Sequence, residues 1–302
     1  MSNSLNFSKH FKKINIFSLI IFILSLLLIF FKGLNYGIDF KGGTMIELRI
    51  LDKKIGISDI RSSFNKMSLG DVSIKEFGKK GDYLIKVEQT ISQQKNLIPE
   101  IKKNLIQNLQ AEISFRRVEN VGPKVSSELL QSGIMAIALS LAAMLFYIWI
   151  RFEWQFSIGS IIALFHDVII TVGVFSLLSF EINLSIIAAV LTIVGYSMND
   201  TVVIYDRIRE NLFKYNKLRI EETSNISINE TLSRTIITSA TTLLALGAIF
   251  ILGGEILKGF SFAMILGVLI GTYSSIFVAS PVLKFFKVSH KTLEKEEEKI
   301  LP

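Results

Sequence analysis

Six long apolar stretches dominate the chain, and each runs for 17 to 25 residues: 14–31, 133–150, 156–180, 184–205, 236–252 and 260–282. A helix of that length crosses a hydrocarbon layer of about 30 Å. Lipid offers no hydrogen-bond partner to backbone N–H and C=O groups, so each stretch must be helical within the layer. The pattern therefore predicts a polytopic α-helical membrane protein with six transmembrane helices.

The first apolar stretch follows Lys9, Lys12 and Lys13, as the apolar core of a secretory signal peptide would. The residues Phe30, Phe31 and Lys32 come directly after it, where a signal peptide has small residues for cleavage. We therefore interpret the stretch as an uncleaved anchor, with a cleaved signal as the alternative.

The basic residues outside the apolar stretches indicate the orientation, because short cytoplasmic segments carry the excess of Lys and Arg. Placing both termini inside puts the N-terminal lysines, Arg151, the six basic residues of 206–235 and the five lysines after Val282 in the cytoplasm. The short outer loops then hold only Lys258. This predicts a bacterial inner-membrane protein with cytoplasmic termini and a periplasmic segment 32–132.

Segment 32–132 shows the periodicity of a small α+β domain. Residues 44–51 alternate apolar and polar positions as a half-buried strand does. Further strands are predicted over 72–77, 83–87 and 113–118, and helices from Ser58 and over 97–109. The order βαββαβ favours a ferredoxin-like fold.

These features divide the chain into four parts. Residues 1–31 form the cytoplasmic N-terminus and first transmembrane helix, and 32–132 form the periplasmic domain. Residues 133–286 form a bundle of five transmembrane helices with a cytoplasmic loop at 206–235, and 287–302 form a charged cytoplasmic tail.

The amino-acid composition argues against several classes of protein. Of the 302 residues, 50% are apolar and 20% are charged, which argues against a soluble enzyme. The net charge of +7 is accounted for by membrane topology rather than by a nucleic-acid surface. Cysteine is absent, His10, His166 and His290 lie far apart, and no phosphate-binding loop occurs. We therefore expect no enzyme activity, no metal site and no cofactor.

Two glycine-containing junctions bracket the predicted domain. Gly37, Asp39, Gly42 and Gly43 belong to a turn after the first apolar stretch, and Gly122-Pro123 precedes the second. Glycine permits backbone angles that other residues avoid. The junctions are interpreted either as tight exits from the membrane or as hinges on which the domain swings.

Asp167 and Asp200 lie within apolar stretches, where an ionised carboxylate costs at least a few kcal/mol. Such a group must be neutralised, paired or hydrated, and a carboxyl group that takes up and releases a proton is a simple proton carrier. The alternatives are an interhelical hydrogen bond or, for Asp200, a position that reaches cytoplasmic water.

Arg234 precedes the fifth stretch at about the expected depth of Asp200, so a salt bridge that breaks on protonation is one interpretation. An ordinary flanking basic residue is the other. A run of hydroxyl residues follows, either lining a hydrated path or packing against other helices: Thr235, Thr238, Ser239, Thr241 and Thr242. The pair Gly267 and Gly271 is interpreted as a helix-packing face.

Together these motifs resemble those of the SecD/SecF family of protein-export membrane proteins, in the resistance-nodulation-division superfamily. The matching residues are 37–43 (GIDFKGG), 121–123 (VGP), 165–167 (FHD), 194–211 (VGYSMNDTVVIYDRIREN) and 232–239 (LSRTIITS). The resemblance implies that Asp200 and Arg234 carry proton movement, and it leaves the role of Asp167 less settled. It also implies a complex with SecD, docking to the SecY–SecE–SecG channel, often with YajC, and unfolded preproteins as substrates.

The resulting hypothesis is export driven by the proton motive force: protonation of Asp200 weakens its pairing with Arg234, and the outer domain moves and retains the emerging chain. Two alternatives stay open. The chain can be half of a proton-driven exporter of small solutes, or a passive scaffold that stabilises the channel.

Overall fold

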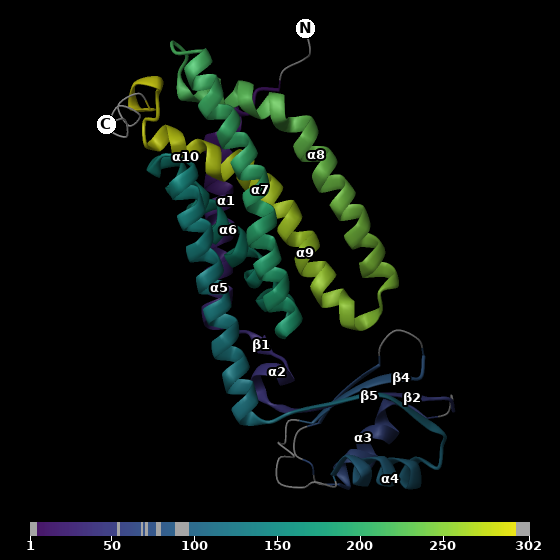
Figure 1. Ribbon diagram of the computed structural model, residues 1–302. Coiled ribbons are helices and arrows are strands. Elements are labelled where there is room, and N and C mark those ends of the chain that lie inside the picture. The colour runs from purple at the N-terminus through teal and green to yellow at the C-terminus, as the bar shows by residue number, and fades with distance from the viewer. Residues whose placement is uncertain are drawn as a thin grey trace. The chain divides into compact units, whose positions relative to one another are not determined.

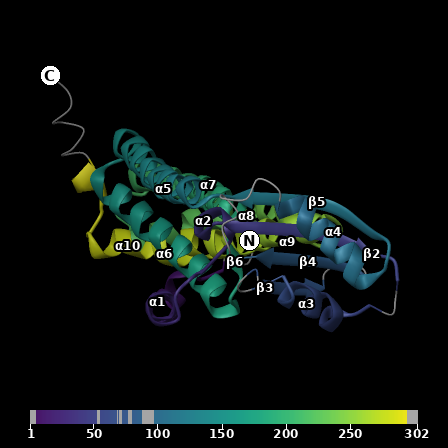
Figure 2. The same cartoon turned by 90° about the horizontal axis from the view of Figure 1, so that it is seen from below.

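The computed structural model describes residues 5–52, 55–67, 69, 72–76, 80–87 and 97–293. Most of the predicted charged tail, 294–302, lies outside the described residues. The chain forms two compact units. We call Met1–Leu34, Ala136–Phe180 and Ser185–Pro302 the helical unit, and Asn35–Met135 with Glu181–Leu184 the sheet unit. Figures 1 and 2 together label the elements of both units.

Long helices build the helical unit. They are α1 (Phe11–Phe31), α5 (Pro123–Arg151), α6 (Trp154–Leu178), α7 (Leu184–Lys214), α8 (Ile220–Leu252) and α9 (Gly254–Ser274), followed by the short α10 (Ser280–Phe285). The first part of α5, up to Met135, belongs to the sheet unit. A π-helical turn at Ser275–Ala279 joins the last two, so that Leu257–Phe285 counts as one span. The described residues thus contain six helical spans long and apolar enough to cross a membrane, which confirms the predicted fold class.

Burial separates central spans from peripheral ones. In the most apolar windows of α6 and α7, 50% of the residues are buried, against 11% in α1 and α5. Large apolar side chains of α1 such as Phe17 and Leu19 are exposed. In a membrane protein such side chains face lipid or another membrane chain, whereas α6, α7 and the α9–α10 span carry the packed core.

The predicted cytoplasmic loop 206–235 is instead largely helical. Helix α7 continues to Lys214, and α8 already begins at Ile220. Arg207 Nε donates to Glu230 Oε2 (2.7 Å), and Asn211 Nδ2 donates to Ser227 Oγ (2.9 Å). Hydropathy shows where a helix leaves the lipid, but a helix can continue beyond that point with polar residues. The polar ends of α7 and α8 therefore could not be recognised as helical from hydropathy.

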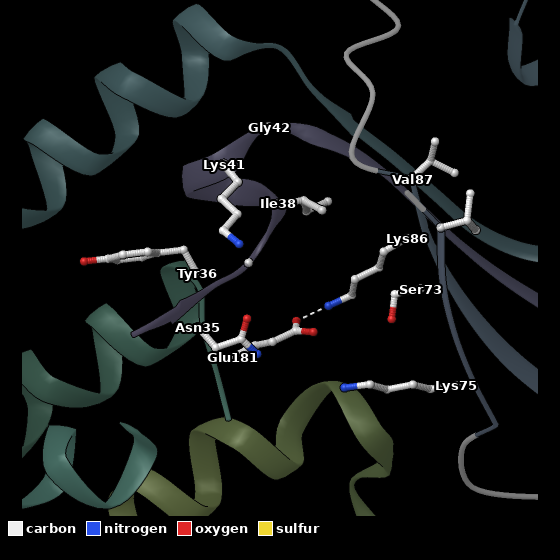
Figure 3. Close-up of a pocket in the computed structure, with 12 residues that line it drawn as sticks. Asn35, Tyr36, Ile38, Lys41, Gly42, Ser73, Lys75, Lys86, Val87 and Glu181 are labelled. Carbon is white, nitrogen blue, oxygen red and sulfur yellow. Dashed lines mark hydrogen bonds and ion pairs between the residues drawn. The ribbon is translucent and has the colours of Figure 1, made fainter. Parts of the chain in front are cut away.

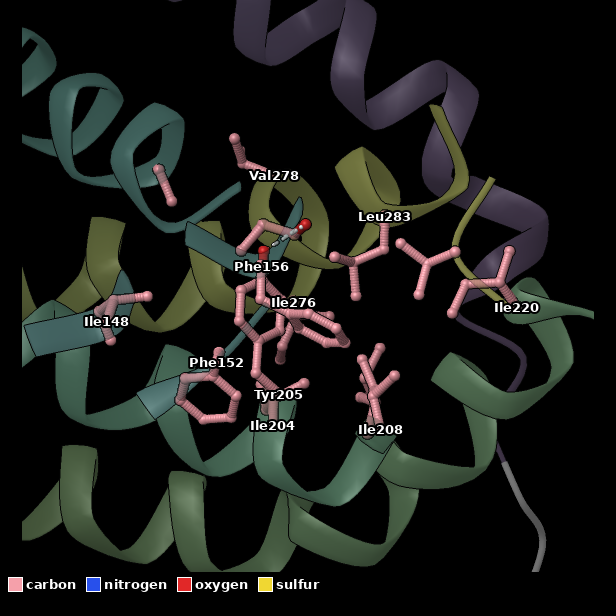
Figure 4. Packing of buried hydrophobic residues seen from close by; sticks show 14 of the residues in the cluster. Ile148, Phe152, Phe156, Ile204, Tyr205, Ile208, Ile220, Ile276, Val278 and Leu283 are labelled. Carbon is pink, nitrogen blue, oxygen red and sulfur yellow. Dashed lines mark hydrogen bonds between the residues drawn. The ribbon is translucent and has the colours of Figure 1, made fainter. Parts of the chain in front are cut away.

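The π-helical turn packs against the buried end of α7. Tyr205, fully buried, donates its hydroxyl to the carbonyl of Ala279 (2.8 Å), as Figure 4 shows. Phe156 lies edge-on to the Tyr205 ring with centroids 5.1 Å apart. Gly159 leaves room for the tyrosine hydroxyl, because a Cβ there would overlap it. The turn therefore supplies the acceptor that this buried hydroxyl needs.

Glycines bring α9 close to α7, as predicted for Gly267 and Gly271. A Cβ on Gly267 would overlap the side chain of Ile193, and one on Gly271 would lie 2.9 Å from Ser197 Cβ. The absence of side chains lets the two helices approach closely, which is how small residues stabilise helix pairs in membranes.

We expect Gly267→Leu to lower the free energy of unfolding by about 1–3 kcal/mol, because it overpacks the α7–α9 contact. Gly247→Leu in α8 is the matched control, since nothing lies within 4 Å of a Cβ there. Denaturant unfolding of both variants in detergent micelles measures the difference. Equal stability of the two variants would contradict this packing.

The sheet unit has the predicted order of elements: β2 (Gly43–Ile50), α3 (Ile57–Asn65), β3 (Val72–Glu76), β4 (Asp82–Val87), α4 (Leu97–Leu109) and β5 (Ile113–Val121). The four strands are antiparallel in the order β3-β4-β2-β5, which is the ferredoxin-like arrangement. Helices α3 and α4 cover one face of the sheet (Figures 1 and 2). Ile46 and Leu48 of β2 point into this core with Ile60 and Phe64 of α3.

A charged pair on β2 and β4 stabilises the opposite face of the sheet. Arg49 donates from Nε and Nη2 to Asp82 (2.5 and 2.6 Å). This hydrogen bonding raises the pKa of Arg49 above its ordinary value.

The glycine turn lies in a small ribbon that the sequence did not reveal. Strand β1 (Asn35–Tyr36) pairs in parallel with β6 (Glu181–Ile182), and the short helix α2 (Ile38–Lys41) follows. Asp39 Oδ2 accepts a hydrogen bond from the N–H of Leu184 (2.9 Å). Gly42 and Gly43 have φ of +81° and +127°, which explains why glycine stands there.

The junction between the predicted domain and the second apolar stretch consists of a single residue, Gly122. Strand β5 ends at Val121 and α5 begins at Pro123, with Gly122 between them. Proline suits the first position of a helix, because its missing N–H has no intrahelical partner there. Whether either junction acts as a hinge stays a prediction.

Candidate functional site

Asp167 lies on α6 among the packed spans and is completely buried. Its Oδ2 accepts hydrogen bonds from Ser197 Oγ of α7 (2.5 Å) and Ser274 Oγ of α9 (2.7 Å). Its Oδ1 lies 2.9 Å from His166 Nδ1. One carboxyl group therefore joins three helices, and each of its oxygens has a polar partner.

His166 extends this network to α1. Its Nε2 lies 2.6 Å from Ser18 Oγ, which is itself buried. If Asp167 is ionised it can only accept, so Nδ1 carries the proton; in a neutral imidazole Nε2 then accepts from the Ser18 hydroxyl. The rings of Phe22 and Tyr273 stack against the imidazole, with centroids 6.4 and 6.2 Å away.

Asp200 lies on α7 three residues after Ser197, and only 4% of its surface is exposed. Its Oδ2 accepts a long hydrogen bond from Thr272 Oγ1 of α9 (3.4 Å). Thr272 Oγ1 in turn lies 2.6 Å from Ser239 Oγ of α8. In contrast to Asp167, Asp200 has one weak partner among the described residues, so its charge is much less compensated by hydrogen bonds.

The salt bridge considered for Asp200 and Arg234 is absent. Within the described residues Arg234 forms no ion pair with a carboxylate at 4 Å or less, and its side chain is exposed. The two side chains are therefore not joined by a salt bridge in this structure.

The hydroxyl run on α8 has a mixed role. Thr238 and Thr241 donate to carbonyls of their own helix, those of Arg234 and Ile237 (both 2.9 Å). Ser239 reaches Thr272 on α9, and Thr242 accepts from the Tyr196 hydroxyl of α7 (3.2 Å). Thr235 Oγ1 is buried and has no hydrogen-bond partner among the described residues. Two members of the run, Ser239 and Thr242, therefore join α8 to other helices, two bond within α8, and Thr235 keeps unused polar capacity beside Arg234.

Sequence reasoning found the carboxyl groups but not their partners. Ser18, Thr272 and Ser274 were missed, because an isolated hydroxyl residue in an apolar stretch gives no sign of which way it points. The only signal was weak: each is a small polar residue within a predicted span. Among the described residues, no three His, Asp or Glu side chains gather in a group that would hold a metal ion.

Comparison with models of protein families shows which family this chain belongs to. The model described as "Protein export membrane protein SecD/SecF, C-terminal" matches residues 101–289, and that described as "SecD/SecF GG Motif" matches residues 27–50. This chain belongs to the SecD/SecF family. The motif match covers the glycine turn, and the longer match covers both membrane carboxyl groups.

Relatives within the SecD/SecF family are similar over nearly the whole chain. The "Protein translocase subunit SecF" of Rickettsia rickettsii is 44% identical over 303 residues, covering 98% of this chain and 97% of its own. The subunit of the same name from Rickettsia bellii is 45% identical over 300 residues, with the same coverage. These names describe a transport component, and with six apolar helices they indicate a multi-pass inner-membrane protein.

Solved SecDF structures share the fold. The crystal structure of SecDF from Thermus thermophilus, described as a translocon-associated membrane protein, matches with a TM-score of 0.84 and 36% identity over 95% of this chain. SecDF in a super-membrane-facing form matches with a TM-score of 0.71 and 35% identity over 99% of this chain. This chain spans 39% and 40% of those two chains, respectively.

Proposed function

We propose that this SecF-type chain works with a SecD partner to use the proton motive force in the late steps of protein export. The observation that carries the proposal is the setting of Asp200. It is a nearly buried carboxyl group in a membrane span, and among the described residues it accepts one weak hydrogen bond. A group held in this way can change its charge without breaking a saturated network.

The similarity to SecDF supports the proposed partners. SecDF is described as translocon-associated, and its solved chain is more than twice as long as the part matched here. We propose that a SecD chain supplies the remainder, and that the complex docks to the SecY–SecE–SecG channel, with YajC as an accessory. Unfolded preproteins are the substrate. Both termini are cytoplasmic and the sheet unit is periplasmic.

The proton step acts on the contact between α7 and α9. With a proton bound, Asp200 is neutral and donates a hydrogen bond instead of only accepting one. The attraction of Arg234 then disappears, and the Thr272–Ser239 pair is free to reorient. Because these groups lie on α7, α8 and α9, the change alters the packing of three spans.

The available energy is sufficient for a two-state change. A potential of 100 mV supplies about 2.3 kcal/mol per proton, and one unit of pH difference adds about 1.4 kcal/mol. Together they shift a two-state equilibrium by a factor of several hundred. The glycine junctions at Gly42–Gly43 and Gly122 are the proposed joints through which this change moves the periplasmic domain and keeps the emerging chain from sliding back.

We assign Asp167 a different role. Its three partners and complete burial favour the interhelical hydrogen-bond interpretation over proton transfer. Asp167 then fixes α6 against α7 and α9, so that the movement around Asp200 takes place beside a rigid neighbour.

The proposal is tested in vesicles that contain the channel and this chain with its SecD partner. We expect the completion of preprotein export to increase when a proton gradient is imposed, and an uncoupler to abolish only that increase. Vesicles without this chain are the control. An increase that survives the uncoupler would indicate a passive scaffold, and transport of a dye by the pair without the channel would indicate a small-solute exporter.

A further inference from the structure

The sheet unit contains a cavity of about 300 Å³ beside the glycine turn. Its walls come from the β1–α2 segment, from Glu181 of β6, and from the ends of β3 and β4 (Figure 3). None of the charged side chains in these walls takes part in the proton step described above, so the cavity requires its own explanation.

The cavity is lined by an excess of positive charge. Three lysines and one glutamate contribute to its walls, giving a net +2: Lys41, Lys75, Lys86 and Glu181. Lys86 is paired with Glu181. Lys41 and Lys75 have no carboxylate partner within the described parts of the chain, and Figure 3 shows their ammonium groups directed toward the space around that pair. Ser73 adds a hydroxyl group to the lining.

Such a lining suits one class of ligand. Two unpaired ammonium groups from different elements, α2 and β3, together with a hydroxyl donor, match the several oxygens of a phosphate group. A carboxylate offers two oxygens and one charge, and would engage fewer of these donors. The volume accommodates a phosphate with an attached glycerol-sized group.

Chain connectivity keeps the cavity near the membrane surface. Asn35, its first lining residue, follows the last residue of α1 by four positions, and Glu181 follows the last residue of α6 by three. Each residue extends the chain by about 3.5 Å at most. The cavity wall therefore begins within about 14 Å of a transmembrane helix end, where lipid headgroups lie.

We propose that this cavity binds a phosphate group, and that the phosphate of a phospholipid headgroup is its occupant. Lys41 and Lys75 bind the phosphate oxygens, while the Lys86–Glu181 pair holds β4 against β6 and fixes the wall. This inference is independent of the proposed proton step, because it concerns other side chains and a binding equilibrium.

Calorimetric titration of the full-length protein in phosphate-free maltoside micelles tests the site. The probes are short-chain phosphatidylglycerol, inorganic phosphate, and a short-chain diacylglycerol that lacks the phosphate. We expect saturable binding of phosphatidylglycerol, weakened about tenfold or more in Lys41→Gln/Lys75→Gln, because each basic side chain near a membrane surface contributes appreciably to anion binding.

Two further double variants make the test specific. Lys66→Gln/Lys103→Gln removes the same charge from the end of α3 and from α4, away from the cavity, and should bind like the unmodified protein. Lys41→Arg/Lys75→Arg keeps the charge and should bind within about threefold of it. Far-ultraviolet circular dichroism confirms that each variant is folded.

The outcomes separate the sources of the phosphate. Binding of phosphatidylglycerol alone supports a lipid headgroup, and binding of inorganic phosphate with the same lysine dependence supports a free phosphate anion in the same site. Equal binding of diacylglycerol, equal loss in the Lys66/Lys103 variant, or no loss in the Lys41/Lys75 variant would each overturn the proposal.

Discussion

Asp200→Asn is expected to abolish the part of export that depends on the proton gradient while leaving the folded protein intact. Asparagine has nearly the same shape and can still accept the hydrogen bond from Thr272. It cannot exchange a proton, so the contribution of about 2.3 kcal/mol per 100 mV is lost and the gradient-dependent rate falls at least about tenfold. Export in vesicles, with and without an imposed gradient, measures this.

The matched control for that prediction is Asp206→Asn. Asp206 is also on α7, six residues further along, but it is exposed and pairs with Arg151. We expect its loss to change gradient-dependent export by less than about twofold, as exposed ion pairs contribute little. A second variant, Asp200→Glu, keeps a titrating group and should retain part of the response. Full gradient dependence in Asp200→Asn would refute the proton role.

Asp167→Ala is expected to lower the free energy of unfolding by about 2–4 kcal/mol. The substitution removes the acceptor for Ser197, Ser274 and His166. Ser274 keeps its bond to the Gly271 carbonyl and His166 keeps Ser18, but the Ser197 hydroxyl and the His166 Nδ1 lose the carboxylate they contact. Denaturant unfolding in micelles measures the loss. Asp167→Asn should cost about 1 kcal/mol or less, because its amide oxygen can accept from both serines and its amide nitrogen can donate to Nδ1 of the other histidine tautomer.

The same two variants separate structure from chemistry at this position. A stable Asp167→Asn protein that keeps its gradient-dependent export supports the anchoring role. A stable Asp167→Asn protein that has lost this dependence would make Asp167 a second proton carrier. If the Asp167→Ala protein were as stable as the unmodified protein, the hydrogen bonds of Asp167 would contribute nothing to the free energy of unfolding.

Much of the fold was predictable because its signals are local. A transmembrane helix requires a long apolar run wherever it packs, so all six spans were found from hydropathy. The alternation in 44–51 marked the central strand, and the order of elements then favoured a ferredoxin-like domain. The two-residue strands β1 and β6 were not predictable, because they are too short to show any periodicity and their pairing joins Asn35 to the distant Glu181.

The candidate site was predictable only in part, for a related reason. A carboxyl group in an apolar run is conspicuous because burying its charge is costly, so Asp167 and Asp200 were found. Their partners depend on how the helices rotate and pack, which is a tertiary property. Ser18 and Thr272 therefore acquire a role only in the folded bundle. The same limit explains why the salt bridge considered for Asp200 and Arg234 could not be decided from the sequence and is absent in the structure.

The π-helical turn at Ser275–Ala279 restricts insertions and deletions in the last span. Such a turn is an α-helix with one residue inserted. Deleting one residue there would restore regular winding, and would also withdraw the Ala279 carbonyl from the buried Tyr205 hydroxyl. Downstream residues would turn by about 100° around the helix axis. Insertions and deletions should therefore be poorly tolerated at this point of the last span.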